Sequence, residues 1–149
     1  MDMIEELYKR IAECEERLSE LEVHEKQNWV MLTSPLTSTS WDGDAYSTTA
    51  KTLIDLSAIF GAPAGIKSVL LKIAINDSGS AANNCVTRVA PNNTADQGLS
   101  VRCSGIANDA VHEGIILCPC NSDGDIYYQI NASGSLTMDV VMQIWGYLL

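Results

Sequence analysis

The sequence predicts a mainly β protein with an N-terminal α-helix: a parallel trimeric coiled-coil stalk, followed by an antiparallel β-sandwich knob of jelly-roll type. Between Met3 and Val23, apolar residues recur at alternating spacings of three and four, which is typical of a coiled coil. From Lys51 onward, short segments of alternating apolar and polar residues are separated by turn residues. Together with residues 28–33 they make about eight short strands, which without a second helix favour a sandwich. We therefore divide the chain into a stalk, residues 1–27, and a knob, residues 28–149.

The helical segment carries one narrow apolar stripe over three heptads, which we call the seam. No Gly or Pro interrupts it, and Glu5 and Glu6 lie in its first turn, where the helix dipole favours negative charge. Because an isolated helix is marginally stable in water, the seam needs a partner helix. The a positions are Ile4, Ile11 and Leu18, and the d positions are Leu7, Cys14 and Leu21.

Two consecutive heptads place Arg at the g position and Glu at the following e position. The pairs are Arg10 with Glu15 and Arg17 with Glu22. They resemble the short trimerisation pattern of coiled coils, in which the Arg lies across the a layer and pairs with the Glu of a neighbouring helix. The alternatives are an ordinary charged helix surface, or a two-stranded coil, which Ile at a with Leu at d favours. We predict a parallel homotrimer.

The knob needs an interface of its own, because the seam ends where Glu25 and Asn28 occupy the next a and d positions. The last predicted strand, residues 136–149, has one fully apolar face and a reverse face of mixed polarity. Trp145 and Tyr147 fall on that reverse face and are predicted to form contacts between knobs. The apolar face comprises Leu136, Met138, Val140, Met142, Ile144 and Leu148.

The other predicted strands follow from apolar alternation and from the turn residues between them. In residues 67–75, Val69, Leu71, Ile73 and Ile75 share one face. Residues 34–49 are rich in Ser, Thr, Pro, Asp and Gly and are predicted to be loop. The remaining predicted strands are residues 28–33, 52–56, 85–90, 99–103, 110–118 and 126–130.

The charge distribution excludes two classes of partner. Residues 1–25 hold nine acidic and three basic residues, and the remainder holds ten acidic and six basic ones, within a net charge of −10. An acidic chain without a basic stripe is a poor ligand for nucleic acids and for anionic membrane surfaces. No apolar run reaches transmembrane length, and the acidic, amphipathic N-terminus does not resemble a secretory signal. We expect no nucleic acid and no membrane insertion.

We expect no metal, no cofactor and no catalytic residues. The five cysteines lack the C-x2-C pairing of zinc sites and are interpreted as reduced thiols in a protein made in a reducing cytosol. Residues 121–125 (Asn-Ser-Asp-Gly-Asp) lack the closing Glu of a calcium loop and favour a hairpin turn. A weak calcium site built from residues 121–125 and 41–44 remains an alternative. The chain has no nucleophile elbow, phosphate loop or His-Glu-x-x-His, which argues against an enzyme.

Three aromatic residues are candidates for stacking against a sugar: Trp41, Tyr46 and Tyr127. The alternative is that they belong to the core or to a subunit interface, where aromatic residues of sandwiches are common.

A short trimeric coil leading into a small β-sandwich resembles the fibre proteins of bacteriophages, namely tail fibres, receptor-binding knobs and head fibres. The resemblance covers most of residues 50–149. It rests on residues 54–57 (Ile-Asp-Leu-Ser), 61–71 (Gly-Ala-Pro-Ala-Gly-Ile-Lys-Ser-Val-Leu-Leu), 77–80 (Asp-Ser-Gly-Ser) and 143–147 (Gln-Ile-Trp-Gly-Tyr). It implies a homotrimer on a virion, with the N-terminus toward the particle. It transfers no binding residues, because such knobs vary most in their loops.

We therefore expect a non-enzymatic homotrimeric virion protein, assembled in the host cytoplasm and exposed on the particle surface. Its expected partners are its own copies, other virion proteins at the N-terminal end, and a host-surface glycan or protein. A tail fibre usually carries an N-terminal docking domain, whereas here the coil follows Met1 at once. The alternative function is therefore a capsid-decoration or head-fibre protein with a purely structural role. An enzyme such as a small glycan hydrolase is the third class.

Overall fold

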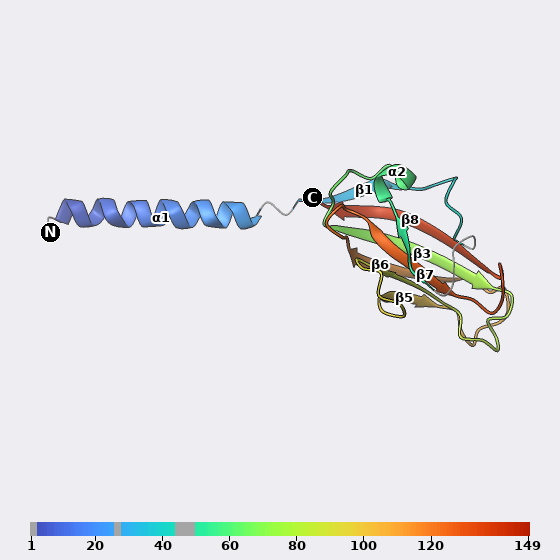
Figure 1. Cartoon of the computed structure of the whole chain (residues 1–149). Coiled ribbons are helices and arrows are strands. Elements are labelled where there is room, and N and C mark those ends of the chain that lie inside the picture. The colour runs from blue at the N-terminus through green and yellow to red at the C-terminus, as the bar shows by residue number, and fades with distance from the viewer. Residues whose placement is uncertain (1–2, 26–27, 44–49) are drawn as a thin grey trace.

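The computed structural model describes residues 3–25, 28–43 and 50–149, and of residues 20–25 only the backbone. A long N-terminal helix, α1 (Met3–Glu25), is followed by two antiparallel four-stranded sheets (Figure 1). The predicted fold class, mainly β with an N-terminal helix, is confirmed.

The two sheets pack face to face, and every pair of neighbouring strands is antiparallel. The chain crosses from one sheet to the other at every connection between strands except β4–β5. The first sheet has the order β1 (Trp29–Leu36), β8 (Met138–Leu148), β3 (Ser68–Asp77), β6 (His112–Pro119). The second sheet has the order β2 (Thr52–Ile54), β7 (Ile126–Asn131), β4 (Val86–Ala90), β5 (Leu99–Arg102).

The core lies between the sheets and is built by strand alternation. In β3, every second residue from Val69 to Ile75 is fully buried, and the residues between them face outward. In β7, Ile126, Tyr128 and Ile130 point into the same core. The faces predicted for these two strands are confirmed.

A second helix, α2 (Leu56–Phe60), corrects the prediction that there is none. Its N-cap is Asp55, whose carboxylate accepts a hydrogen bond from the Ala58 amide at 2.8 Å. It ends at Gly61, which adopts the left-handed conformation with φ 75°. Leu56 and Phe60 are buried one turn apart. A helix of five residues is too short to show a helical period, so the sequence pattern did not reveal it.

Strand β1 continues to Leu36, three residues beyond the predicted end. Pro35 lies within this strand, and the strand tolerates it because β1 is at the edge of the first sheet.

Residues 119–125 do not form the predicted hairpin. They carry the chain from β6 in the first sheet to β7 in the second. Gly124 has φ 91°, and a Cβ added there would lie 2.7 Å from the backbone nitrogen of Gly65. The glycine of the Asp-Gly pair thus allows two loops to approach closely at this end of the sandwich.

A bulge in β8 changes the predicted faces of the last strand. Leu70 pairs with Gly146 and Leu71 with Ile144, so Trp145 is an extra residue in the ladder. Tyr147 therefore lies opposite buried Val69 and packs against the core. The prediction that Tyr147 shares the face of Trp145 was wrong, because each bulge residue shifts the alternation by one. By the same shift Leu148, predicted on the apolar face, pairs with Ser68 and Trp29 on the other side of the strand.

Leu136 lies outside the last strand. Its side chain is 71 % exposed, and its backbone adopts φ 55° in the turn before Met138. Its assignment to the apolar face was therefore wrong.

Candidate functional site

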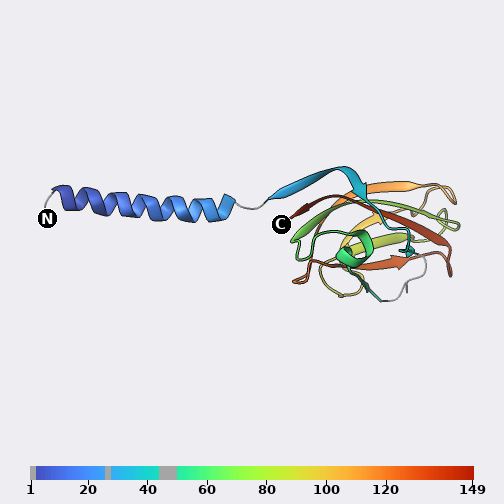
Figure 2. The same ribbon diagram turned by 90° about the horizontal axis from the view of Figure 1, so that it is seen from above.

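The seam of α1 is exposed in the single chain. The side chains of Ile4 and Leu18, at its two ends, are 56 % and 60 % exposed. Both views show the helix extending away from the sandwich (Figures 1 and 2). The other predicted seam and pairing residues with described side chains, namely Leu7, Arg10, Ile11, Cys14, Glu15 and Arg17, are also exposed. The side chains of Leu21 and Glu22 lie outside the described residues.

The face of the first sheet that points away from the second sheet, which we call the outer face, is unusually apolar. Ile115 is 77 % exposed and Met31 64 % exposed on its two edge strands. Monomeric soluble proteins rarely expose a continuous apolar patch of this kind, which favours an interaction surface. The apolar residues of the outer face are Trp29 and Met31 of β1, Leu70 of β3, Ile115 and Leu117 of β6, and Val141 and Trp145 of β8.

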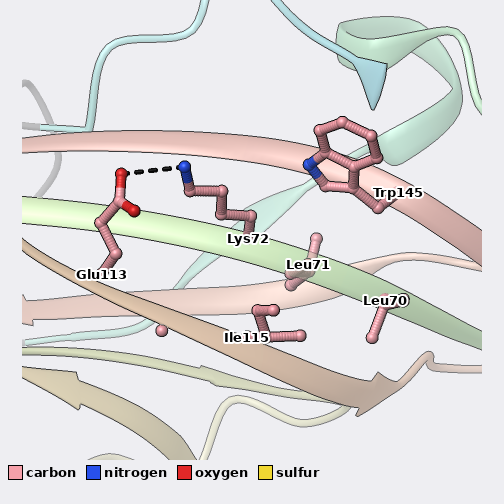
Figure 3. Close-up of a pocket in the computed structure, with 7 residues that line it drawn as sticks. Leu70, Leu71, Lys72, Glu113, Ile115 and Trp145 are labelled. Atoms are coloured by element: carbon pink, nitrogen blue, oxygen red, sulfur yellow. Dashed lines mark ion pairs between the residues drawn. The ribbon is translucent and has the colours of Figure 1, made fainter. Parts of the chain in front are cut away.

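A groove of about 580 Å³ runs across the middle of the outer face (Figure 3). Trp145, Leu70 and Ile115 lie around it, from β8, β3 and β6 respectively. The indole of Trp145 is half-buried, and its Nε1 donates to Gln143 Oε1 at 3.2 Å. The prediction that Trp145 lies on the outward side of the last strand is confirmed, while its role between knobs stays a prediction.

Two pairs of polar side chains on the outer face interact within the chain. Lys72 Nζ and Glu113 Oε1 form an ion pair of 2.9 Å between β3 and β6 at the rim of the groove (Figure 3). Asn76 Nδ2 donates to Asp139 Oδ2 at 3.2 Å. A face whose charges already have partners tolerates burial against another protein better than one with unpaired charges.

The two stacking candidates that the structure describes, Trp41 and Tyr127, do not form a common site. Trp41 packs in the core, with ring centroids 6.1 Å from Phe60 and 5.3 Å from Tyr128. Its position favours the alternative interpretation, that it is a core residue. Tyr127 is half-buried on the opposite side of β7 from Tyr128, and Tyr46 lies outside the described residues.

At the end of the sandwich away from α1, three loops meet at Asp77, the last residue of β3 (Figure 1). The fully buried carboxylate accepts hydrogen bonds from the amides of Gly79 and Ser133, at 2.7 and 3.0 Å, and from Thr137 Oγ1 at 3.0 Å. Burial raises the pKa of Asp77, but these hydrogen bonds lower it by more, so the net pKa lies below its ordinary value.

Two further links join these loops. The hydroxyl of Ser80 donates to the carbonyls of Ile106 and Ala107, and the amide of Asp109 donates to the Asp77 carbonyl at 3.0 Å. Asp77 was not among the residues predicted to carry a structural or functional role. The sequence does indicate its position: when the alternation of residues 67–75 is continued by two residues, the carboxylate of Asp77 falls on the apolar face.

The cysteine thiols differ in exposure. Cys85 and Cys103 are buried beside Asp77, Cys118 is buried, and Cys120 is half-buried. Burial raises the pKa of Cys85 and of Cys118 to about 11 each, and that of Cys120 to about 12. Within residues 3–25, 28–43 and 50–149, no group of three or more His, Cys, Asp or Glu side chains is placed to hold a metal ion.

Side-chain oxygens of the acidic loop 121–125 accept hydrogen bonds from backbone amides of the same chain. Asn121 Oδ1 accepts the amides of Asp123 and Asp125 at 2.9 Å each. Asp125 Oδ1 accepts the amide of Leu56 at 3.0 Å, linking this loop to the start of α2. These contacts are those of a structural turn.

The chain matches no protein-family model and no curated protein sequence. In the described part of the chain, neither helix is long and apolar enough to span a membrane.

Proposed function

We propose that the protein is a non-enzymatic, homotrimeric structural protein of a virion, of the bacteriophage fibre or knob class. It displays a β-sandwich for binding a receptor or glycan on the host surface. The observation that carries this proposal is the combination of two exposed apolar surfaces in one chain. The seam of α1 leads directly into β1, an edge strand of the sheet whose outer face is apolar.

In this proposal the stalk is a parallel three-stranded coiled coil. The exposed seam supports it, because a helix with one apolar stripe is stable only against a partner. Arg10 and Arg17 would each reach the Glu of a neighbouring helix, Glu15 or Glu22. The side chains of Arg10 and Arg17 are both exposed in the single chain, which leaves them accessible to a neighbouring helix.

The knob is proposed to be a jelly roll. Support comes from eight strands in two four-stranded antiparallel sheets, with strand orders 1-8-3-6 and 2-7-4-5. Such repeated crossing between two sheets, with a single hairpin within one sheet, is what a double Greek key requires. The arrangement places the loops around Asp77 at the end away from the stalk (Figure 1).

The stalk then provides avidity. Three knobs held on one coil have a high effective concentration, so that three weak contacts act together. The loops around Asp77 are the parts of each knob that first meet a surface opposite the stalk. The hydrogen bonds to Asp77 hold these loops in one conformation before binding, which lowers the entropic cost of binding.

The second candidate is a capsid-decoration or head-fibre protein with a purely structural role. One observation favours it: Trp41, a candidate for sugar stacking, belongs to the core. Binding of the labelled protein to intact host cells would support the display function. Binding to empty capsids alone would instead support the decoration function.

The first test of the proposal is the mass in solution by light scattering. We expect three times the chain mass of 16.1 kDa for the full chain. Replacing both Arg10 and Arg17 with Ala should shift the oligomeric state, because the contacts specific to three strands are lost. Lys9→Ala is the matched control, since Lys9 lies at an f position away from the seam. A full chain that is a dimer, or a monomer, would refute the fibre proposal.

A further inference from the structure

We propose that the outer face of the first sheet is the contact surface between knobs, and that the β1 side of one copy packs against the β6 side of the next. Three such contacts close around the stalk axis. This inference rests on the proposed homotrimer and adds which surface of each copy meets which.

The connection between α1 and β1 places the first sheet next to the axis. Helix α1 ends at Glu25 and β1 begins at Trp29. Four residue steps span at most about 14 Å. In a parallel coil of three helices, the three β1 strands must therefore all begin close to the axis. The second sheet has no such constraint, because β2 begins only at Thr52.

The strands of the first sheet run roughly along the direction of α1 in both views (Figures 1 and 2). The outer face therefore lies along the axis over much of its length. Three outer faces turned toward a common axis would cover the apolar side chains that one copy leaves exposed. Trp145 and Leu70, in the middle of the face, would lie nearest the axis.

A closed threefold arrangement requires two different surfaces that fit each other. The outer face has them: Met31 lies on the β1 side, and Ile115 and Leu117 lie on the β6 side. These are among the most exposed apolar side chains of the knob. A twofold arrangement would instead return every contact between the same two copies, so that a link from position 31 to position 115 could join two copies but never three.

The charged residues at the groove of the outer face are compatible with a second copy as the partner. Lys72 and Glu113 already neutralise each other at 2.9 Å, so an apolar neighbour leaves neither charge alone. A partner of complementary charge has little to bind here, whereas a second copy presents the same apolar residues. The competing occupant is the chain's own α1, folded back so that its seam covers the outer face.

Cysteine cross-linking of the full chain tests the inference. In a Cys14→Ser background, Met31→Cys and Ile115→Cys are introduced together, and the protein is treated with a mild copper–phenanthroline oxidant. Within one chain these positions lie on β1 and β6, separated by β8 and β3. Three strand spacings amount to about 14 Å, too far for a disulfide within the chain. Any disulfide between these positions therefore joins two copies.

We expect the double variant to form covalent two-chain and three-chain species, with each single variant giving none above background. Cross-linking by Ile115→Cys alone would place Ile115 against its own copy, and two-chain species without any three-chain species would indicate a twofold contact; either result would overturn the inference. A protein of three copies that does not cross-link would overturn the inference while leaving the trimer intact. A monomer in light scattering would refute the proposed function itself.

A second measurement does not depend on disulfide geometry. Ile115→Asp should raise the protein concentration needed for trimer formation at least tenfold, because it buries a carboxylate between knobs. Leu53→Asp is the matched control, since Leu53 is 44 % exposed on β2 of the second sheet. Both positions are open in the single chain, so both variants should fold. Equal effects of the two variants would overturn the inference.

Discussion

Thr137 donates its hydroxyl to the Asp77 carboxylate at 3.0 Å, across 60 residues of sequence. Asp77 ends β3 and Thr137 immediately precedes β8, the strand that pairs with β3 along its whole length. This contact therefore closes the far end of the central strand pair of the first sheet. The same carboxylate also accepts the amides of Gly79 and Ser133, so it satisfies groups from both adjoining loops.

Replacing Asp77 with Ala should destabilise the knob strongly. Three hydrogen-bond donors would lose their acceptor in a buried site, which we expect to cost roughly 2–4 kcal/mol of the free energy of unfolding. Denaturant unfolding at fixed protein concentration measures this. Asp123→Ala is the control, because Asp123 is exposed in the loop between β6 and β7 and lies outside the outer face. Similar losses in the two variants would show that Asp77 does not organise the loops.

The contribution of Asp77 should depend on pH. Because its folded pKa lies below the ordinary value of 3.8, ionised Asp77 favours the folded state. This contribution is fully present above pH 3.8 and is lost as the pH falls through the folded pKa. We expect the difference in unfolding free energy between the wild-type chain and Asp77→Asn to shrink below pH 3.8. A difference that stays constant between pH 6 and the acid range would contradict this.

Gly124→Ala should be more harmful than Gly105→Ala, although both glycines have positive φ. A Cβ at Gly124 would lie under 3 Å from the backbone of Gly65 and Ile66, whereas nothing lies within 4 Å of a Cβ at Gly105. We expect Gly105→Ala to lose about 1–2 kcal/mol from backbone strain alone, and Gly124→Ala to lose more. Thermal melting of the two variants provides the comparison. Equal melting temperatures would mean that the loops at residues 65 and 124 separate without cost.

The rate at which Cys14 is alkylated should show whether the coiled coil has formed. The thiol is exposed in a single helix, but it occupies a d position that a trimer would cover. We expect slow alkylation of Cys14 in the wild-type chain and fast alkylation in the Arg10→Ala, Arg17→Ala double variant, followed by mass spectrometry of peptides. Cys85 and Cys118 serve as internal controls, because burial and a pKa of about 11 keep both unreactive until the knob unfolds. Rapid reaction of Cys14 in the wild-type chain would refute the coil.

Trp145→Ala should loosen the contact between knobs. The indole lies beside the groove of the outer face, so its loss removes apolar area from the proposed interface. We expect a lower melting temperature that depends more steeply on protein concentration than in the wild-type chain. Concentration dependence separates a contact between copies from packing within one chain. Normal melting and normal mass would contradict the interface.

The spacing of apolar residues and the positions of turn-forming residues were sufficient to predict the long helix and most strands. The seam predicted α1, and alternation predicted the residues that β3 buries from Val69 to Ile75, but the predicted strand ended two residues before Asp77. The prediction failed at α2 and at the bulge of Trp145. Five helical residues carry too little periodicity to detect, and a bulge is an extra residue in a ladder, visible only once the partner strand is known. Tyr147 was therefore placed on the wrong face.

The sequence by itself determined the apolar pattern of this protein: the seam, the strands, and the side of β8 that carries Trp145. Those features depend on the spacing of neighbouring residues, which the backbone geometry of helices and strands converts directly into faces. Only the tertiary structure decided that Trp145 joins Met31, Leu70 and Ile115 on one surface, and that Asp77 collects three loops. Both groupings depend on which strands lie side by side. The strand order brings together residues that are far apart in the sequence, and nothing in the sequence indicates that such residues are in contact.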